Sequence, residues 1–214
     1  NVGSCKFSDL TVFSFHPVKM ITTAEGGMVT TNNKKLANIL LMLRSHGIER
    51  EKEKFLNNNI LSNQHPIYYE QQMLGYNYRM PDVLATLGNS QADKLNSFVE
   101  SRNIVAKNYD KFFSNSSLIL PEIDKKDISS FHLYVIEVKK NRNKILNILR
   151  NKGILASIHY IPIHFHPYYQ KLGFKLGDFP NSEKYYENCI SIPIYPNLKL
   201  EEQDFVIKQI LQII

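Results

Sequence analysis

The stretch LTVFSFHPVK, residues 10–19, places a hydroxyl, an imidazole and a primary amine at the end of a short apolar run. Residues 10–15 are mostly β-branched or aromatic, which predicts a strand, and GMVTT at 27–31 predicts a second. Pro17, Gly26 and Gly27 lie between the two runs and predict a turn. The pattern therefore places Lys19 on a turn between two strands.

A turn that carries Ser14, His16 and Lys19 could bind an anion and react with a carbonyl group. A lysine amine can attack an aldehyde to form an imine, and it can act as a general base once its pKa falls from about 10.4 towards 7 or 8. Such a shift costs about 4 kcal/mol and requires burial or a nearby cation. An exposed lysine after a strand is the commoner outcome for such a turn, so the residues alone leave both interpretations open.

The rest of the chain predicts helices and loops, followed by a compact α+β unit. Asn33 is expected to cap a helix that ends near Gly47, because the apolar residues between them recur every three or four positions. Polar stretches at 48–64 and 71–79 predict loops. We then expect helices from Pro81 and over 95–109, a strand at 133–138, a helix at 144–152, a strand at 154–159, and helices near Glu183 and Glu201.

Composition restricts the class of protein. Of the 214 residues, 43% are hydrophobic, which can supply a core. No run of about 18 apolar residues and no signal-peptide layout is present, so we expect neither membrane insertion nor export. Cys5 and Cys189 are far apart, which favours reduced thiols in the cytoplasm. The formal charge of +6 attracts anions in general, but the lysines are dispersed, so nucleic-acid binding is not expected.

Longer strings of sequence resemble one enzyme family. FSFHPVK at 13–19, followed by TTAEGG at 22–27, closely resembles the lysine motif of the DegT-type sugar aminotransferases. Further blocks that look like this family follow in the same order at 44–48, 69–70, 74–80, 159–164 and 177–180. Within the family, YYEQ at 68–71, HPYY at 166–169 and SIPIYP at 191–196 look most like one branch. That branch makes UDP-4-amino-4,6-dideoxy-N-acetyl-β-L-altrosamine, a precursor of pseudaminic acid.

The resemblance implies a fold type I α/β protein that depends on pyridoxal 5′-phosphate. Its reaction would transfer an amino group from glutamate to a UDP-4-keto-6-deoxy sugar. Lys19 would hold the cofactor covalently and then shuttle a proton, and the Ser14 hydroxyl would donate to the cofactor phosphate. Asn77 would extend across a homodimer interface to the phosphate bound by the neighbouring subunit.

The same resemblance assigns four residues to the sugar-nucleotide pocket: Arg79, His159, Tyr160 and His164. A guanidinium fork matches phosphate oxygens, although an interface ion pair would use Arg79 equally well. His159, His164 and His166 lack the spacing and the acidic partner of a metal site, so we expect no metal. Ordinary core or surface positions remain the alternative for these histidines, and His16 receives no proton-transfer role.

The resemblance also predicts the organisation of the chain. Residues 1–93 would be the C-terminal remnant of the large cofactor-binding domain, and 94–214 the small C-terminal domain with its linking helix. Family members carry a long segment ahead of the lysine block. We therefore expect a C-terminal fragment that leaves apolar surface uncovered beside its first strand, and that aggregates or binds cofactor poorly.

Two alternatives to a transaminase remain. One is a non-catalytic fragment that serves only for dimerisation or binding. The other is a sugar dehydratase of the same family. Dehydratases of this family replace the lysine with histidine, whereas Lys19 is retained here.

Overall fold

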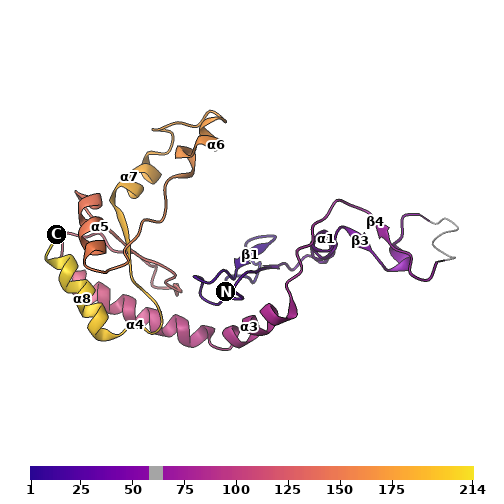
Figure 1. The fold of residues 1–214 in the computed structure, drawn as a ribbon, viewed down its shortest axis with the longest axis horizontal. Coiled ribbons are helices and arrows are strands. Elements are labelled where there is room, and N and C mark those ends of the chain that lie inside the picture. The colour runs from indigo at the N-terminus through magenta and orange to yellow at the C-terminus, as the bar shows by residue number, and fades with distance from the viewer. Residues whose placement is uncertain (58–64) are drawn as a thin grey trace. The chain divides into compact units, whose positions relative to one another are not determined.

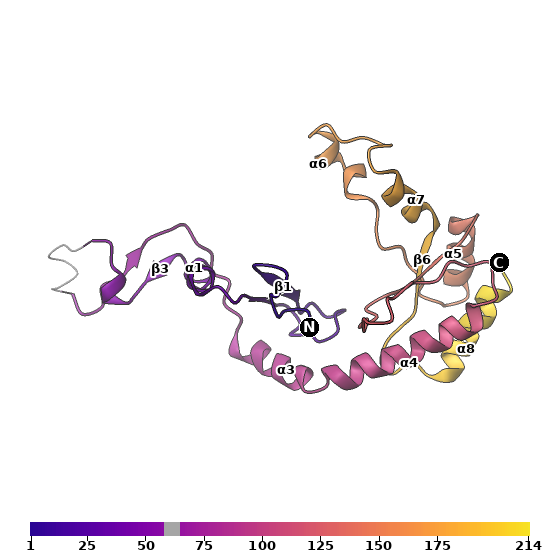
Figure 2. The ribbon, with the colours of Figure 1, turned by 180° about the vertical axis from the view of Figure 1, so that it is seen from behind.

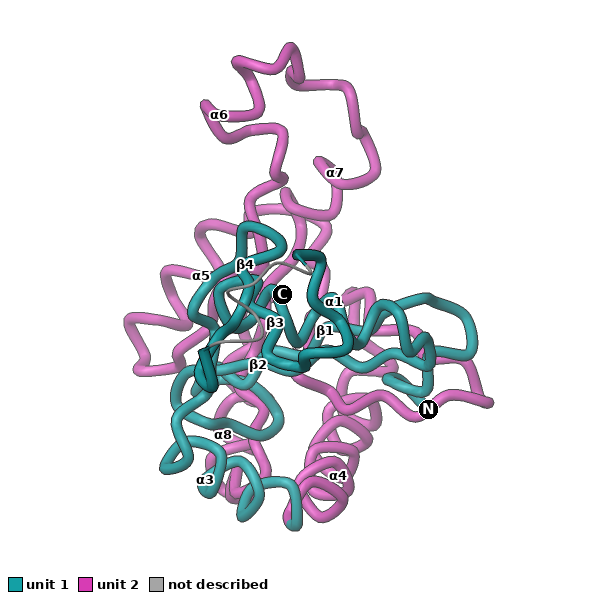
Figure 3. Tube along the Cα trace, turned by 90° about the vertical axis from the view of Figure 1, so that its right-hand side faces the viewer, with its two compact units in different colours: residues 1–93 teal, residues 94–214 magenta. Residues whose placement is uncertain are grey.

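The computed structural model spans residues 1–214 and consists of two compact units, residues 1–93 and residues 94–214 (Figures 1 and 3). The structure describes residues 1–57 and 65–214. No helix within these ranges is long and apolar enough to cross a membrane.

Unit 1 consists of short strands and two longer helices. Its elements are β1 (Thr11–Ser14), β2 (Gly27–Thr30), α1 (Lys34–Arg44), β3 (Ile48–Glu49), the 3-10 turn η1 (Lys52–Lys54), β4 (Glu70–Gln71) and α3 (Asp82–Ala92). β1 and β2 pair antiparallel, with Thr11 opposite Thr30 and Ser14 opposite Gly27. The two predicted strands and the turn between them are therefore confirmed.

Helix α1 begins where the sequence predicts. The Asn33 side-chain oxygen accepts hydrogen bonds from the backbone N–H groups of Lys35 and Leu36, at 2.9 and 3.3 Å. These are two of the donors that the first turn of a helix leaves without an intrahelical partner. The predicted cap is confirmed.

The two segments predicted as loops contain a short pairing. Ile48 pairs with Gln71 and Glu49 pairs with Glu70, antiparallel. The buried Glu70 carboxylate accepts hydrogen bonds from the backbone N–H groups of Leu56 and Asn57, at 2.6 and 2.9 Å. The prediction of plain loop is wrong here, because this carboxylate and the β3–β4 pairing organise the segment. Residues 58–64 of the predicted loop lie outside the described residues.

Unit 2 places helices around a two-stranded sheet (Figure 2). Its elements are α4 (Leu95–Phe113), β5 (Tyr134–Glu137), α5 (Arg142–Asn151), η2 (Ile163–Phe165), α6 (Pro167–Gln170), α7 (Pro180–Asn188), β6 (Cys189–Ile192) and α8 (Leu200–Leu211). β5 and β6 pair antiparallel, with Tyr134 opposite Ile192 and Glu137 opposite Cys189.

One predicted strand of unit 2 is wrong and one observed strand was not predicted. Residues 154–159 contribute only an isolated bridge, from Ser157 to Ser191, and Leu155 is 82% exposed. The observed partner of β5 is strand β6. All four residues of β6 are buried, including the polar Ser191.

The apolar core of the described residues lies within unit 2. Tyr109 and Phe113 of α4 pack with Tyr134 of β5, and the Tyr109 hydroxyl donates to the Pro193 carbonyl oxygen at 2.8 Å. Within unit 1, no described apolar side chain is buried, and Val12 of β1 is 75% exposed. The expectation of uncovered apolar surface beside the first strand is confirmed.

Candidate functional site

The β1–β2 hairpin carries both Ser14 and Lys19. Ser14 ends β1 opposite Gly27, where a Cβ atom would lie 2.7 Å from the Phe13 carbonyl oxygen, so the close approach of the strands requires glycine. Beyond β1, the Lys19 N–H donates to the His16 carbonyl oxygen at 2.9 Å and closes a tight turn. The strand ladder and this turn therefore fix the backbone on which the lysine and the serine stand.

The polar ends of these two side chains are available to a ligand. The Ser14 hydroxyl oxygen accepts from the His16 N–H at 3.5 Å, and its own proton is donated to no described residue. The half-buried Lys19 side chain forms no hydrogen bond or ion pair within the described part of the chain. A hydroxyl donor and a primary amine on one hairpin suit a ligand that carries both a phosphate and an aldehyde.

The turn of this hairpin is packed against the segment that leads into α3. A Cβ atom on Gly26 would lie 2.6 Å from the methyl group of Met80, and one on Gly88 would lie 2.7 Å from the Thr23 side-chain methyl. Thr23 is itself buried, and its hydroxyl donates to the Glu25 carbonyl oxygen. Contacts from Met80 and from Gly88 of α3 therefore support the turn of the hairpin.

The loop that carries Asn77 and Arg79 is bonded to the end of α1. The N–H groups of Tyr76 and Tyr78 donate to the carbonyl oxygens of Leu43 and Arg44 at 2.7 and 2.9 Å. Asn77 itself forms a bridge with Ser45. These main-chain bonds hold the loop in an extended conformation.

The side chains of Asn77 and Arg79 contact each other, and the neighbouring Tyr76 and Tyr78 are exposed. Arg79 Nε donates to Asn77 Oδ1 at 2.6 Å, which leaves the two amide protons of Asn77 free to donate. Tyr76 and Tyr78 stack with their ring centroids 4.7 Å apart. The arrangement presents an amide donor beside a guanidinium, a combination suited to phosphate oxygens.

The other three predicted site residues, which are His159, Tyr160 and His164, lie in unit 2. His159 Nδ1 is 2.7 Å from the hydroxyl of Ser191, which is buried in β6. Tyr160 is 69% exposed and meets the His159 ring edge-on, with centroids 4.5 Å apart. Ser191 was not predicted as a site residue, because it lies 32 positions from His159 and no local pattern connects them.

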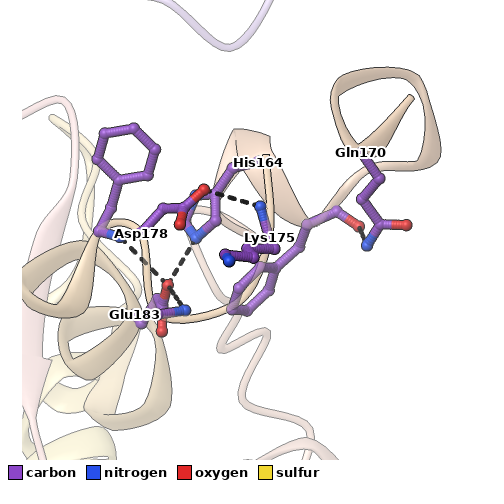
Figure 4. A network of polar contacts seen from close by, with 8 residues as sticks. His164, Gln170, Lys175, Asp178 and Glu183 are labelled. Atoms are coloured by element: carbon purple, nitrogen blue, oxygen red, sulfur yellow. Dashed lines mark hydrogen bonds and ion pairs between the residues drawn. The ribbon is translucent and has the colours of Figure 1, made fainter. Parts of the chain in front are cut away.

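His164 is buried and bonded to an acidic residue (Figure 4). Its Nε2 atom lies 2.8 Å from Glu183 Oε1, and the same oxygen accepts the backbone N–H groups of Gly177 and Phe179 at 2.8 and 3.4 Å. The sequence predicts a substrate contact for His164 but gives no sign of Glu183 as its partner. Among the described residues, no group of three or more His, Cys, Asp or Glu side chains could hold a metal ion.

Comparison with known proteins gives one consistent result. The family model for the DegT/DnrJ/EryC1/StrS aminotransferase family matches residues 2–211. An uncharacterized protein of Methanocaldococcus jannaschii, MJ1066, is 40% identical over 213 residues, which are 96% of this chain and 54% of that protein. UDP-4-amino-4,6-dideoxy-N-acetyl-beta-L-altrosamine transaminase of Campylobacter jejuni is 36% identical over 215 residues, which are 96% of this chain and 52% of that protein.

Solved structures agree with the sequence comparison. Helicobacter pylori PseC, an aminotransferase of pseudaminic acid biosynthesis, matches with a TM-score of 0.85 and 33% identity over 96% of this chain and 53% of that protein. The chain thus spans about half the length of the relatives it matches. The predicted fold class, fold type I, is confirmed by these neighbours. The chain belongs to the DegT/DnrJ/EryC1/StrS aminotransferase family.

Proposed function

We propose that this chain provides the lysine-bearing part of a sugar aminotransferase that depends on pyridoxal 5′-phosphate, with Lys19 as the residue that holds the cofactor. The observation that carries the proposal is the Lys19 amine, which has no partner among the described residues and belongs to the same hairpin as the Ser14 hydroxyl, whose proton is donated to no described residue. A solved relative from Streptococcus pneumoniae with 29% identity exists in a PLP-form and a PMP-form. Residues 1–93 would belong to the cofactor-binding domain and 94–214 to the small domain.

The residues present fit the cofactor. Ser14 can donate its hydroxyl proton to the phosphate, and Asn77 can donate amide protons because its oxygen is already used by Arg79. When bound, pyridoxal phosphate supplies the electron sink that amino transfer requires. The Lys19 amine would hold the cofactor and would take up or deliver a proton at the substrate carbon, a general acid–base role that its position on a fixed turn supports.

We propose that the amino acceptor is a UDP-4-keto-6-deoxy sugar and that glutamate is the donor. Support comes from the relatives of the altrosamine branch and from the chemistry of the predicted substrate residues in each unit. Arg79 is suited to the diphosphate, and the exposed Tyr160 hydroxyl and the His159 ring are suited to the sugar. His164 would contribute through the ring nitrogen that Glu183 does not occupy.

The proposed enzyme works as a homodimer in which Asn77 reaches the phosphate of the neighbouring site. The supporting observation is the exposed Tyr76–Tyr78 stack beside Asn77, which provides apolar area for an interface. A second candidate function, a non-catalytic module for dimerisation or binding, is favoured by the length of the chain, which is about half that of its relatives.

Borohydride trapping tests the role of Lys19. The purified chain is incubated with a large excess of pyridoxal phosphate, because weak binding is expected of this chain by itself, and is then reduced and mapped by peptide mass spectrometry. Far-UV circular dichroism establishes that it is folded. The pyridoxyl group is expected on the Lys19 peptide, to be lost in Lys19→Arg and to persist in Lys35→Arg, which alters an exposed lysine of α1. If the folded Lys19→Arg variant is labelled as strongly as the wild-type chain, the proposal is withdrawn.

Addition of glutamate separates the two candidate functions. If the cofactor is held at Lys19 and glutamate converts it to the amine form, the absorbance maximum of the cofactor changes before any sugar is added, and the transaminase proposal is supported. If trapping at Lys19 succeeds but glutamate causes no change, the chain binds the cofactor without transferring an amino group. The non-catalytic module then becomes the better description.

A further inference from the structure

A single carboxylate organises the segment between α6 and α7 (Figure 4). Glu183 stands in the first turn of α7, and its Oε1 atom accepts the Gly177 and Phe179 N–H groups as well as His164 Nε2. The Asp178 side chain closes the same turn, because it accepts the Lys175 N–H at 2.9 Å. The segment from Lys175 to Phe179 is therefore tied to the imidazole through Glu183.

The His164–Glu183 pair is shielded from water. The side chains of His164 and Glu183 are 6% and 13% exposed, and the imidazole centroid lies 4.6 Å from that of Phe165 and 4.9 Å from that of Phe179. Burial raises the pKa of the Glu183 carboxyl, but the hydrogen bonds from His164, Gly177 and Phe179 outweigh burial and hold that pKa below its usual value. The carboxylate is therefore ionised near neutral pH.

An ionised carboxylate has no proton to donate, so the proton of the hydrogen bond belongs to His164 Nε2. In the neutral imidazole this leaves Nδ1 as the acceptor nitrogen, and Nδ1 makes no hydrogen bond within the described part of the chain.

We propose that Glu183 is a positioning residue that fixes the Nε2–H tautomer of His164. Nδ1 is then the ring nitrogen that accepts a hydrogen bond from a substrate hydroxyl. Glu183 also holds the Lys175–Phe179 turn beside that ring. The hydroxyl contact rests on the proposed function, whereas the tautomer and the turn do not. Glu187, one turn further along α7, is exposed and has no described partner, which makes it a matched control.

Nitrogen-15 NMR of the whole chain, labelled at histidine, tests the tautomer without any variant and without cofactor. At a pH high enough for the imidazole to be neutral, the wild-type His164 signals are expected to show a protonated Nε2 and an unprotonated Nδ1. Glu183→Gln keeps the shape of the side chain but removes its charge and adds donor protons, so the signals are expected to move towards a mixture of tautomers. Glu187→Gln leaves them unchanged. A wild-type spectrum with the proton on Nδ1 overturns the proposal.

Amide hydrogen exchange tests the turn in the same samples. The Gly177 and Phe179 amides are expected to exchange roughly tenfold faster in Glu183→Gln, since each loses a bond to a charged acceptor. Exchange in β5 and β6 should not change, and it serves as the check that the variant is folded. Equal exchange at Gly177 and Phe179 in wild type, Glu183→Gln and Glu187→Gln would contradict the positioning role.

A titration with UDP-N-acetylglucosamine tests the contact with substrate. In the wild-type chain the Nδ1 signal of His164 is expected to move as the sugar nucleotide binds, and in Glu183→Gln this movement is expected to be lost. Binding without any movement overturns the hydroxyl contact, while the tautomer result is unaffected. Failure of cofactor trapping at Lys19 would withdraw the aminotransferase proposal and would alter none of these NMR outcomes.

Discussion

Two glycines set the path of the loop that carries Asn77. Gly47 has a φ of +69°, and a Cβ atom there would lie 1.9 Å from the Met73 carbonyl oxygen. A Cβ atom on Gly75 would lie 2.4 Å from the backbone nitrogen of Gly47. The two main chains can approach this closely only because neither residue has a side chain. The position of the Asn77 amide therefore depends on residues that contain no functional group.

Gly47→Ala is expected to detach this loop. The positive φ costs an L-residue about 1 to 2 kcal/mol, and the overlap with backbone adds about 1 to 3 kcal/mol. Amide exchange at Tyr76 and Tyr78, which donate to the end of α1, should therefore accelerate markedly. Gly153→Ala is the control, because Gly153 has a φ of +80° and nothing within 4 Å of the added Cβ. Equal losses of stability in the two variants would show that the close approach is unimportant.

At the scale of elements, α1 connects the hairpin to the Asn77 loop, and its start is set by one side chain. Asn33→Ala removes the acceptor for the Lys35 and Leu36 N–H groups and should cost about 1 kcal/mol. Asn38→Ala, at an exposed position inside the same helix, should instead stabilise α1 by roughly 0.5 kcal/mol, because alanine has the higher helix propensity. Amide exchange within α1 measures both changes, and a loss of the same size in Asn38→Ala would argue against the capping role.

The elements that could be predicted from sequence are those with a local signal. Asn33 caps α1, Pro81 precedes α3, and the apolar, aromatic and β-branched run at 133–136 marks β5. Strand β6 is only four residues long and follows α7 without an intervening turn, so no turn signal marks its start. The 154–159 segment has strand composition, but it joins the sheet only through Ser157.

The residues of the candidate site also divide into those with a local sequence signal and those without one. Ser14, Lys19, Asn77 and Arg79 stand in short motifs, and the structure brings each pair onto one hairpin or one loop. Glu183 and Ser191 are bonded to their histidines across 19 and 32 positions, and such distant pairings leave no pattern in the sequence. Partners of this kind appear only once the chain is folded.

At the scale of the whole molecule, apolar burial is unevenly distributed. The buried apolar residues of the described chain lie between Val105 and Ile210, whereas the buried side chains of unit 1 are polar, namely Thr23 and Glu70. Hydrophobic burial is the dominant favourable contribution to folding. The β5–β6 sheet should therefore contain the slowest-exchanging amides of the chain, and the β1–β2 hairpin should exchange faster.

Leu149→Ala tests where this stability comes from. Leu149 of α5 is fully buried in the core of unit 2, and its truncation is expected to cost about 2 to 5 kcal/mol because a cavity remains. Leu155→Ala removes the same atoms from a side chain that is 82% exposed and should change stability by less than about 0.5 kcal/mol. Amide exchange at Ile136 and Ile190, which face each other in the β5–β6 pair, measures both variants. If Leu155→Ala weakened protection there as much as Leu149→Ala, burial within unit 2 would not be the source of its stability.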